Sequence, residues 1–456
     1  MATFEDWIEA QYHHCAHQIL RSISATDIIK QRPGFGVTVQ AGVGSVVASP
    51  VLASYDPEPD YFFHWYRDSA VVMDSLRILY ERGTLGDEAL QLFEQFVQFS
   101  LAADQLDGRA LVEQPQWRAR VQPDFVQYLR PNAELALAHG ERIRGETRLN
   151  ADGTLDISRW PRPQHDGIAT RALILMRWLR LPMLEPAVRE AASRLLKADL
   201  HYTRRQWSEP SYDIWEEDLG LHYYTLCAAA AALGDDPACA AIYRMLDGFW
   251  DATAGHYRSR ALHSGAASPK QLDIAVILAA VHTDLPGVRH SPSDPRIHAT
   301  LDRLEELFAD RYAINAQRPI GAGPAMGRYA GDVYYSGGAY YFSTLGAAEL
   351  CYLAACRMAP AAAPPWLQRG DAFLATVRAF TPPEGDLSEQ FDQTTGAPSS
   401  ARHLTWSYAA FISATAARSR ALQGGTLQKL EPGPCTIRPG VRLIAYKARQ
   451  GCVGSH

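Results

Sequence analysis

The sequence lacks the features that mark several large classes of protein. No uninterrupted apolar run reaches membrane-spanning length. No Walker loop, GxGxxG or HExxH motif is present. The seven cysteines are odd in number and include no CxxC pair, so they do not form a disulfide framework. We therefore expect no membrane segment, no nucleotide or other cofactor and no metal ion.

Excess positive charge is also missing. The formal net charge is −6 and the pI is about 6.2, and no basic cluster stands out, which argues against a nucleic-acid partner. Met1–Ala10 carries acids and no Lys/Arg-plus-apolar segment, so no signal peptide is visible. We expect a cytoplasmic monomer, although a chain whose leader had been removed would look the same.

Helical periodicity dominates the 456 residues. The pattern predicts about twelve helices. Their expected ranges are Phe4–Ile23, Ser69–Arg82, Gly86–Ala103, Gly167–Leu181, Glu185–His201, Gly220–Leu233, Pro237–Phe249, Leu272–His282, Pro295–Ala309, Ala339–Arg357, Pro364–Phe380 and Thr405–Arg420.

These helices alternate in character. The first, third and following odd members carry one apolar stripe, whereas the even members, such as the one containing Ile274–Ala280, are apolar or small nearly all round. A helix that is apolar on every face must be enclosed, and one with a single stripe lies outside. The alternation predicts an all-α (α/α)6 barrel, a double ring of helices with minor β-hairpins in its loops. We expect residues 1–423 to form this domain and residues 424–456 an extended tail packed on it.

The loops that enter the inner helices should emerge on one face of such a barrel. They are rich in acids and aromatics, whereas the opposite connections are short and plain. One rich face indicates a site built on loops over a rigid scaffold. These loops include Tyr61–Asp68, Trp160–Gly167, Trp215–Glu217, Lys270–Asp273, Gly327–Tyr335 and Leu387–Asp392. The long connection 104–166, with a predicted hairpin at Arg148–Asp156, should form a wall of the site.

The densest of these loops is Tyr212–Gly220, which holds three consecutive carboxylates and two aromatic rings before a buried helix. Carboxylates at a helix start are also explained by capping and by the helix dipole. Aromatic rings beside acids, however, are what a sugar site needs for stacking, for hydroxyl recognition and for proton transfer. Glycoside hydrolysis requires two carboxylates on opposite sides of the scissile bond. Glu216 and Glu389, 173 positions apart in the sequence, are expected on the same face.

Several segments resemble the glucoamylase family, glycoside hydrolase family 15, and they occur in the order of that family. They are Asp60–Ala70, Arg162–Gly167, Tyr212–Glu217, Gly327–Tyr329, Ser388–Asp392 and Leu404–Ala410. The resemblance implies an (α/α)6 barrel and an inverting, exo-acting hydrolase of the glucan 1,4-α-glucosidase type, which releases glucose from non-reducing ends of α-glucans.

The resemblance also implies roles for individual residues. Glu216 corresponds to the general acid and Glu389 to the general base. The matching substrate-binding positions are Tyr61, which helps to place the water, Arg67 and Asp68, which bind the terminal glucose, Glu217 and Arg328, which are further sugar contacts, and the aromatic walls Trp160, Trp215, Tyr334 and Trp406.

Two departures from the family bear on specificity. His64 replaces an aromatic or small polar residue, and Asp218–His222 replaces a run of Val-Asn-Gly-Ser-Ser type. No starch-binding module or preceding β-sandwich is seen, which favours short oligosaccharides over raw starch. The linkage stays open between α-1,4, α-1,6 and α,α-1,1, so trehalase-type and glucodextranase-type specificities are alternatives. A phosphorylase or lyase on the same barrel, or a sugar-binding protein without catalysis, are the remaining hypotheses.

Overall fold

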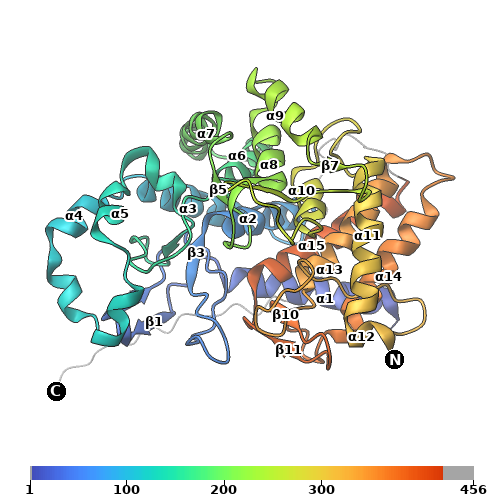
Figure 1. Ribbon diagram of the computed structural model, residues 1–456, viewed down its shortest axis with the longest axis horizontal. Coiled ribbons are helices and arrows are strands. Elements are labelled where there is room, and N and C mark those ends of the chain that lie inside the picture. Colours follow the sequence, from blue (N-terminus) through green and yellow to red (C-terminus); the bar gives the residue numbers. More distant parts are fainter. Residues whose placement is uncertain (1–2, 425–456) are drawn as a thin grey trace. The chain divides into compact units, whose positions relative to one another are not determined.

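The computed structural model describes residues 3–424, which form one compact unit built mainly of helices (Figure 1). Twelve long helices make up its frame. Six lie inside: α2 (Tyr66–Glu81), α6 (Asp166–Leu179), α8 (Tyr223–Leu233), α10 (Ala275–Thr283), α13 (Tyr341–Arg357) and α15 (Thr405–Leu422). Six lie outside: α1 (Phe4–Leu20), α3 (Asp87–Ala103), α7 (Pro186–Gln206), α9 (Ala238–Asp247), α11 (Pro295–Arg311) and α14 (Pro364–Phe380).

The inner helices close into a ring. Each packs against the next in chain order, from α2 through α6, α8, α10 and α13 to α15, and α15 packs back on α2. Their sequences explain the enclosure: every residue of α10 except His282 is buried, and α13 is buried from Tyr341 to Ala355. The ring confirms the predicted (α/α)6 barrel and its alternation of inner and outer helices.

The outer helices cover the ring with a single apolar face. In α3, Phe93, Phe96 and Val97 are buried, whereas Glu94 between them is exposed. The Phe93 ring stacks on Trp178 of α6 with centroids 4.2 Å apart, and the Trp178 indole donates to the Met73 carbonyl at 3.0 Å. The buried indole nitrogen of Trp178 therefore has the hydrogen-bond acceptor that an enclosed N–H group requires.

Short elements fill the loops. The helices are α4 (Gly108–Glu113), α5 (Asn132–Leu137) and α12 (Ala313–Ala316), with 3-10 turns at Pro33–Phe35, Pro115–Arg120, Pro123–Tyr128 and Gly140–Gly145. The strands are β1 (Ile29–Arg32), β2 (Val37–Gln40), β3 (Phe63–Trp65), β4 (Arg148–Asn150), β5 (Ser211–Tyr212), β6 (Leu219–His222), β7 (Trp250–Asp251), β8 (His256–Tyr257), β9 (Arg260–Leu262), β10 (Gln390–Phe391) and β11 (Pro398–Ser399). All their pairings are antiparallel, β1 with β2, β3 with β4, β5 with β6, β6 with β9, β7 with β8 and β10 with β11.

Several predicted boundaries were wrong. Gly220–His222 belongs to strand β6 and not to a helix, because Gly220 pairs with both Ser211 and Leu262. Helix α2 begins three residues earlier than expected, at Tyr66. The short helices α4, α5 and α12 were missed, since segments of four to six residues carry too little periodicity.

The connection 104–166 is partly helical and lies at one edge of the unit, where Figure 1 shows α4 and α5 apart from the ring. The hairpin expected at Arg148–Asp156 is reduced to one bridge between Leu149 and Leu155. Its first strand, β4, pairs instead with β3, Trp65 opposite Arg148. This pairing ties the long connection to the segment that leads into α2.

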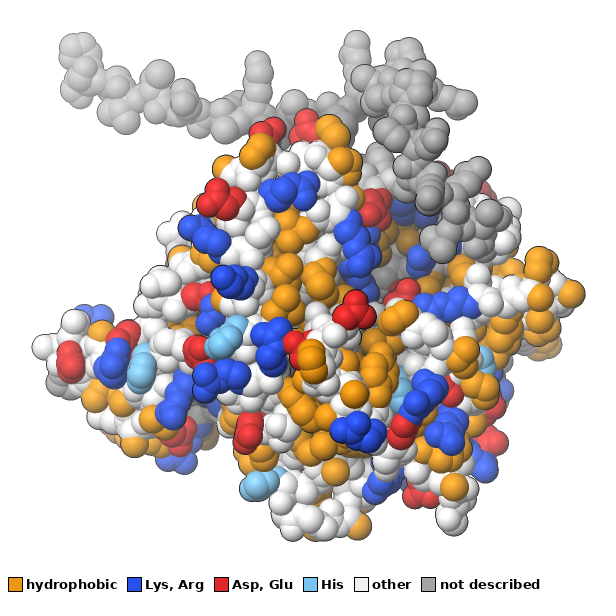
Figure 2. Space-filling view, turned by 90° about the horizontal axis from the view of Figure 1, so that it is seen from above, with side chains coloured by type: hydrophobic (Ala, Val, Ile, Leu, Met, Phe, Trp, Pro, Cys, Tyr) orange, Lys and Arg blue, Asp and Glu red, His pale blue; other side chains and the backbone are white. Residues whose placement is uncertain are grey.

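The tail predicted at 424–456 falls, from residue 425 onward, outside the described residues. Across the described part of the chain, no helix is both long enough and apolar enough to cross a membrane. On the face shown in Figure 2, acidic and basic side chains are interspersed among apolar and uncharged ones.

The close approach of α6 to the start of α2 generates a stability prediction. A Cβ added at Gly167 would lie 2.7 Å from Tyr66 Cβ and 2.9 Å from the Arg67 backbone nitrogen. Gly167→Ala should therefore lower the free energy of unfolding by about 1–3 kcal/mol, as overpacking does. Gly42→Ala is the control, because its new Cβ would have no neighbour nearer than 3.5 Å. Equal urea midpoints for the two variants would contradict this packing.

Candidate active site

A cavity of about 260 Å³ opens where the inner helices begin. All eleven residues predicted for the site line it: Tyr61, Arg67, Asp68, Trp160, Trp215, Glu216, Glu217, Arg328, Tyr334, Glu389 and Trp406. The loops that carry them come from six different parts of the chain, so the ring brings together residues far apart in sequence. Within residues 3–424, no group of three or more His, Cys, Asp or Glu side chains is arranged to hold a metal ion.

Glu216 lies on the turn between β5 and β6, and not directly at the start of α8. Its backbone has φ of 65°, an uncommon value for a residue with a side chain. The indole of Trp65 donates to its Oε1 at 2.7 Å, and the indole of Trp160 donates to its Oε2. Both oxygens of the carboxylate are therefore held in place by aromatic donors.

Burial is the main cause of an upward shift in the Glu216 pKa, opposed by the charges of Arg67 and Arg148. The side chains of the two acids that follow Glu216 in the sequence are engaged elsewhere. Glu217 accepts from Lys270 Nζ at 2.7 Å, and Asp218 accepts from Arg260 at 2.6 Å. Asp68 is the acid that contributes.

The Glu216 turn is fixed by a buried ion cluster behind it. Asp213 Oδ1 accepts from the Glu217 backbone N–H at 2.8 Å, and Asp213 Oδ2 accepts from Arg260 at 2.8 Å. Arg260 is 1% exposed and also donates to Asp273. A buried charge with this many partners keeps a single geometry, which holds the strained turn in place.

Glu389 is 8% exposed and stands at the start of the β10–β11 hairpin. Ser400 Oγ donates to its Oε2 at 2.5 Å, and Tyr61 Oη donates to its Oε1 at 3.4 Å. Burial raises the pKa of Glu389 to about 7, while the Ser400 hydrogen bond and the Arg328 charge lower it. A carboxylate poised near neutrality can exchange a proton with water.

Tyr61 and Tyr334 share a hydrogen bond of 2.7 Å between their hydroxyls. Burial raises the pKa of Tyr61 well above its usual range, and the nearby Glu389 charge adds to the shift. Burial also raises the pKa of Tyr334, so both phenols stay protonated; because Tyr61 donates to Glu389, the Tyr334 hydroxyl donates to Tyr61 Oη.

Arg67 joins three acids at the bottom of the cavity. Its guanidinium contacts Asp166 at 3.2 Å, Asp68 at 3.3 Å and Glu216 at 3.5 Å. Arg67 is 4% exposed, and burial raises the pKa of both Asp68 and Asp166. A planar guanidinium next to carboxylates suits adjacent sugar hydroxyls, since it offers donors and acceptors at fixed spacing.

Arg328 organises the other side. It donates to both oxygens of Asp332 at 2.6 Å and lies 3.1 Å from Glu217 Oε1. Glu217 also accepts from the Tyr329 hydroxyl at 2.6 Å. This network gives the cavity a second guanidinium–carboxylate pair.

Aromatic rings line the cavity between these polar groups. Trp406 stacks on Phe342 with centroids 4.6 Å apart and planes at 11°, and Phe342 in turn stacks on Trp215 at 6.0 Å. The Trp215 indole donates to Asp273 at 2.9 Å, which fixes the ring. Flat apolar faces between hydrogen-bonding groups suit a sugar ring, which has both kinds of surface.

The residues of the site that were not predicted from the sequence include Trp65, Asp166, Ser400 and Phe342. Trp65 and Asp166 belong to the quoted motifs, yet the sequence showed no reason to choose them over their neighbours. Ser400 reaches Glu389 because β10 and β11 pair Gln390 with Ser399, and recognition of that hairpin would have found it. Phe342 falls within the predicted inner helix Ala339–Arg357, where an apolar side chain is expected to belong to the core.

The departure noted at His64 does not reach the cavity. His64 is fully buried, and its Nδ1 accepts from the Val46 backbone N–H at 3.0 Å. Burial lowers its pKa to about 3, so the ring is neutral. His64 therefore supports β3 from behind, because successive side chains of a strand face opposite ways.

The fold and the paired acids in a polar, aromatic cavity are those of a carbohydrate-active enzyme. The profile of the family described as "Glycosyl hydrolases family 15" matches residues 139–370 and 360–416, more than half of the chain. The chain belongs to this family of glycoside hydrolases.

Curated relatives agree with this assignment. A glucoamylase of Neurospora crassa is 27% identical over 87% of this chain and 67% of its own length. Glucoamylase P of Amorphotheca resinae is 29% identical over 83% of this chain and 65% of its own length. The chain thus spans about two thirds of the length of these relatives.

Solved structures extend the agreement to the fold. The glucoamylase of Hormoconis resinae superposes with a TM-score of 0.71 at 26% identity, covering 92% of this chain and 74% of that one. The family 15 glucoamylase of Hypocrea jecorina gives 0.73 at 24% identity, covering 91% and 72%. The second likeness, at that identity, shows the fold alone.

The Ser400–Glu389 hydrogen bond generates a pH prediction. Ser400→Ala removes a donor that lowers the Glu389 pKa, so this pKa should rise. If hydrolysis requires ionised Glu389, the acidic limb of kcat/KM on maltose should move to higher pH, by up to about one unit. Ser193→Ala, on the exposed face of α7, is the matched control. If the acidic limb of Ser400→Ala stayed at the same pH or moved to lower pH, the influence of Ser400 on the Glu389 pKa would be contradicted.

Proposed function

We propose that the protein is an inverting, exo-acting α-glucoside hydrolase. It releases β-glucose from the non-reducing ends of α-1,4-linked and/or α-1,6-linked gluco-oligosaccharides. The observation that carries this proposal is one cavity lined by both Glu216, whose side chain is 11% exposed, and Glu389, which is buried, each with a raised pKa. Two such acids flanking one bond are the requirement of glycoside hydrolysis.

In this proposal Glu216 is the general acid. Its raised pKa keeps a proton available for the glycosidic oxygen of the leaving group. The indoles of Trp65 and Trp160, which hold its two oxygens, orient the carboxyl group. The nearby Arg67 limits the rise of the pKa, and the proton can therefore still be given up.

Glu389 is the general base in the same proposal. It accepts a proton from a water molecule that attacks the anomeric carbon from the opposite face, which inverts the configuration. Ser400 and Tyr61 hold one carboxylate oxygen each, and the Tyr61–Tyr334 pair is placed to orient the water. The two acids then exchange their protonation states, and both must be reset before the next turnover.

Substrate recognition is assigned to the two guanidinium–carboxylate pairs. Arg67 with Asp68 would bind the hydroxyls of the terminal glucose, and Arg328 with Glu217 those closer to the scissile bond. Trp406 and Phe342 stack on each other in the wall of this cavity of about 260 Å³. Attack at chain ends fits such a cavity, because an internal bond needs a groove open on both sides. The relatives named glucoamylase support the same substrate class.

Removal of the acid tests the function. Glu216→Gln should lower kcat on maltose by about 10²–10⁴-fold, the usual contribution of a general acid. The isosteric amide keeps an acceptor for only one of the two indoles and sets its NH2 group against the other, so the unfolding midpoint is measured beside kcat to show that the variant is folded. Glu306→Gln, an exposed acid of α11 with 64% of its side chain accessible, is the control.

Near-normal turnover in Glu216→Gln would refute the assignment. Initial rates on maltose, isomaltose and trehalose would then separate the linkages. Trehalose as the preferred substrate would replace the proposed specificity with the α,α-1,1 alternative. Binding of maltose without turnover by the parent enzyme would favour the non-catalytic hypothesis.

A further inference from the structure

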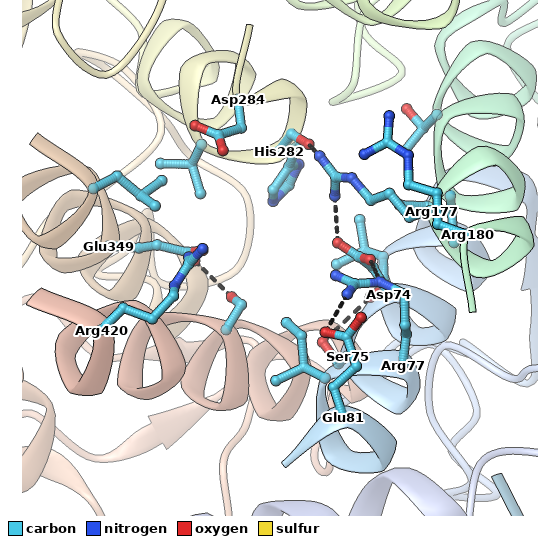
Figure 3. A pocket seen from close by; sticks show the side chains of 17 residues that line it. Asp74, Ser75, Arg77, Glu81, Arg177, Arg180, His282, Asp284, Glu349 and Arg420 are labelled. Atoms are coloured by element: carbon cyan, nitrogen blue, oxygen red, sulfur yellow. Dashed lines mark hydrogen bonds and ion pairs between the residues drawn. The ribbon is translucent and has the colours of Figure 1, made fainter. Parts of the chain in front are cut away.

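A second cavity, of about 270 Å³, lies at the other end of the inner ring (Figure 3). Its wall is formed by the middle and C-terminal parts of the inner helices α2, α6, α10, α13 and α15, whereas the catalytic cavity opens where these helices begin. It has nearly the volume of the catalytic cavity but no Trp, Tyr or Phe in its wall. A stacking site for sugar rings is therefore not built here.

A thin layer separates the two cavities. Trp406 lines the catalytic cavity and His282 lines the second one, and their ring centroids are 5.9 Å apart. The Tyr224 hydroxyl bonds to His282 Nδ1 at 2.8 Å. Burial lowers the pKa of His282 to about 3, so this ring is neutral and carries no charge into the second cavity.

The C-terminal end of a helix exposes carbonyl oxygens and carries a partial negative charge, which would repel an anion. Here guanidinium groups cover several of these carbonyls. Arg177 donates to the His282 carbonyl at 2.8 Å, and Arg189 donates to the carbonyls of Leu179 at 2.6 Å and Leu181 at 2.7 Å. One carbonyl at the end of α10 and two at and after the end of α6 thus already have donors without any ligand.

Most acids of the wall are also neutralised. Asp74 accepts from Arg77 at 2.8 Å and is paired with Arg177, and Arg77 extends to Glu81 at 2.6 Å. Asp284 is paired with Arg357. These ion pairs neutralise Asp74, Glu81 and Asp284. The other polar residues of the wall therefore determine which ligand the cavity can bind.

Two guanidinium groups of the wall remain unengaged. Within the described part of the chain, the side chains of Arg180 and Arg420 make no hydrogen bond or ion pair, and both residues are exposed. Figure 3 shows them on opposite sides, Arg180 beside Arg177 and Arg420 beside Glu349. Each guanidinium offers five N–H donors in a planar fork, which matches a carboxylate or a phosphate.

Glu349 provides a third polar group in the wall of this cavity, beside the two guanidinium groups. It is 8% exposed and belongs to helix α13, and the only hydrogen-bond partner of its side chain among the described residues is Ser413 Oγ at 2.6 Å. Burial raises its pKa to about 8, so near neutral pH it is mainly a carboxylic acid with an O–H to donate. A buried acid that the core does not need is costly, and such groups gather at binding sites.

The wall thus holds unengaged donors on Arg180, Arg420 and protonated Glu349. We propose that the cavity bounded by Arg180, Glu349 and Arg420 is a binding site for a small oxyanion, a carboxylate or a phosphate no larger than a monosaccharide. The two guanidinium groups bind the anionic oxygens from opposite sides, and the Glu349 hydroxyl donates to them from within. The site is distinct from the catalytic cavity and shares with it only the layer of His282 and Trp406.

Calorimetry of the full 456-residue chain tests this site, with sulfate and succinate as probes in an imidazole chloride buffer. Sulfate represents phosphate-like ligands and keeps its charge between pH 6 and 9, and succinate represents organic carboxylates. We expect at least one probe to bind with a Kd of about 1 mM or tighter. Binding of sulfate alone would assign a phosphate-type ligand, and binding of succinate alone an organic acid. No binding of either probe would overturn the proposal.

The double variant Arg180→Gln with Arg420→Gln locates the site. Loss of two charge-assisted interactions should weaken binding at least tenfold, and hydrolysis of maltose should be unchanged because neither residue lines the catalytic cavity. Arg303→Gln, on the exposed face of α11, is the control. Unchanged affinity in the double variant would overturn the assignment, since the anion would then bind elsewhere.

A pH series tests the part of Glu349. The charged groups that face it are Asp74 of α2, Asp284 after α10 and Arg420 of α15. Sulfate binding should weaken severalfold from pH 6 to pH 9, because ionised Glu349 repels the anion. The dependence should vanish in Glu349→Gln, whose amide still donates. An identical pH dependence in parent and variant would remove Glu349 from the site.

Discussion

The buried guanidinium of Arg67 is the interaction on which both the fold and the site depend. It is carried by α2, pairs with Asp166 of α6 and reaches Glu216 on the turn before β6. An unpaired charge at this depth would cost several kcal/mol, so the three segments must meet at one place. The closure of the inner ring and the position of the proposed acid are consequently set by the same contacts.

The two ends of the ring differ because their connections differ. At the end where the inner helices begin, long loops bring Trp, Tyr and acids over the cavity, and the hydrogen bonds of Trp65, Trp160 and Ser400 fix the two carboxylates. At the other end the connections are short, and arginines close the helix termini. The first end favours chemistry on a sugar ring, and the second favours the binding of charge.

The sequence predicted the architecture well because a helix that is enclosed on all sides has apolar or small residues on every face. A helix such as α10 has no polar face, and its pattern could not belong to the outside. The eleven cavity residues were predicted because their motifs occur in a familiar order and the alternation of helices places those loops on one face. All eleven line one cavity, and the roles of Glu216 and Glu389 are part of the proposed function. The predictions that were wrong or missing concern local structure. Gly220–His222 forms a strand because Gly220 pairs with Leu262. Ser400 contacts Glu389 through a short hairpin that the sequence pattern did not predict. Long-range pairing decides such points, and periodicity does not contain it.

The central claim is that Glu216 and Glu389 act on opposite faces of one glycosidic bond with water between them. Proton NMR of the sugar released from maltose, recorded within the first minutes before mutarotation, tests this claim most directly. The account predicts that the new anomeric signal is that of β-glucose, with the α-anomer appearing only as equilibrium is approached. An initial α-glucose signal, an unsaturated sugar or a sugar phosphate would each contradict it.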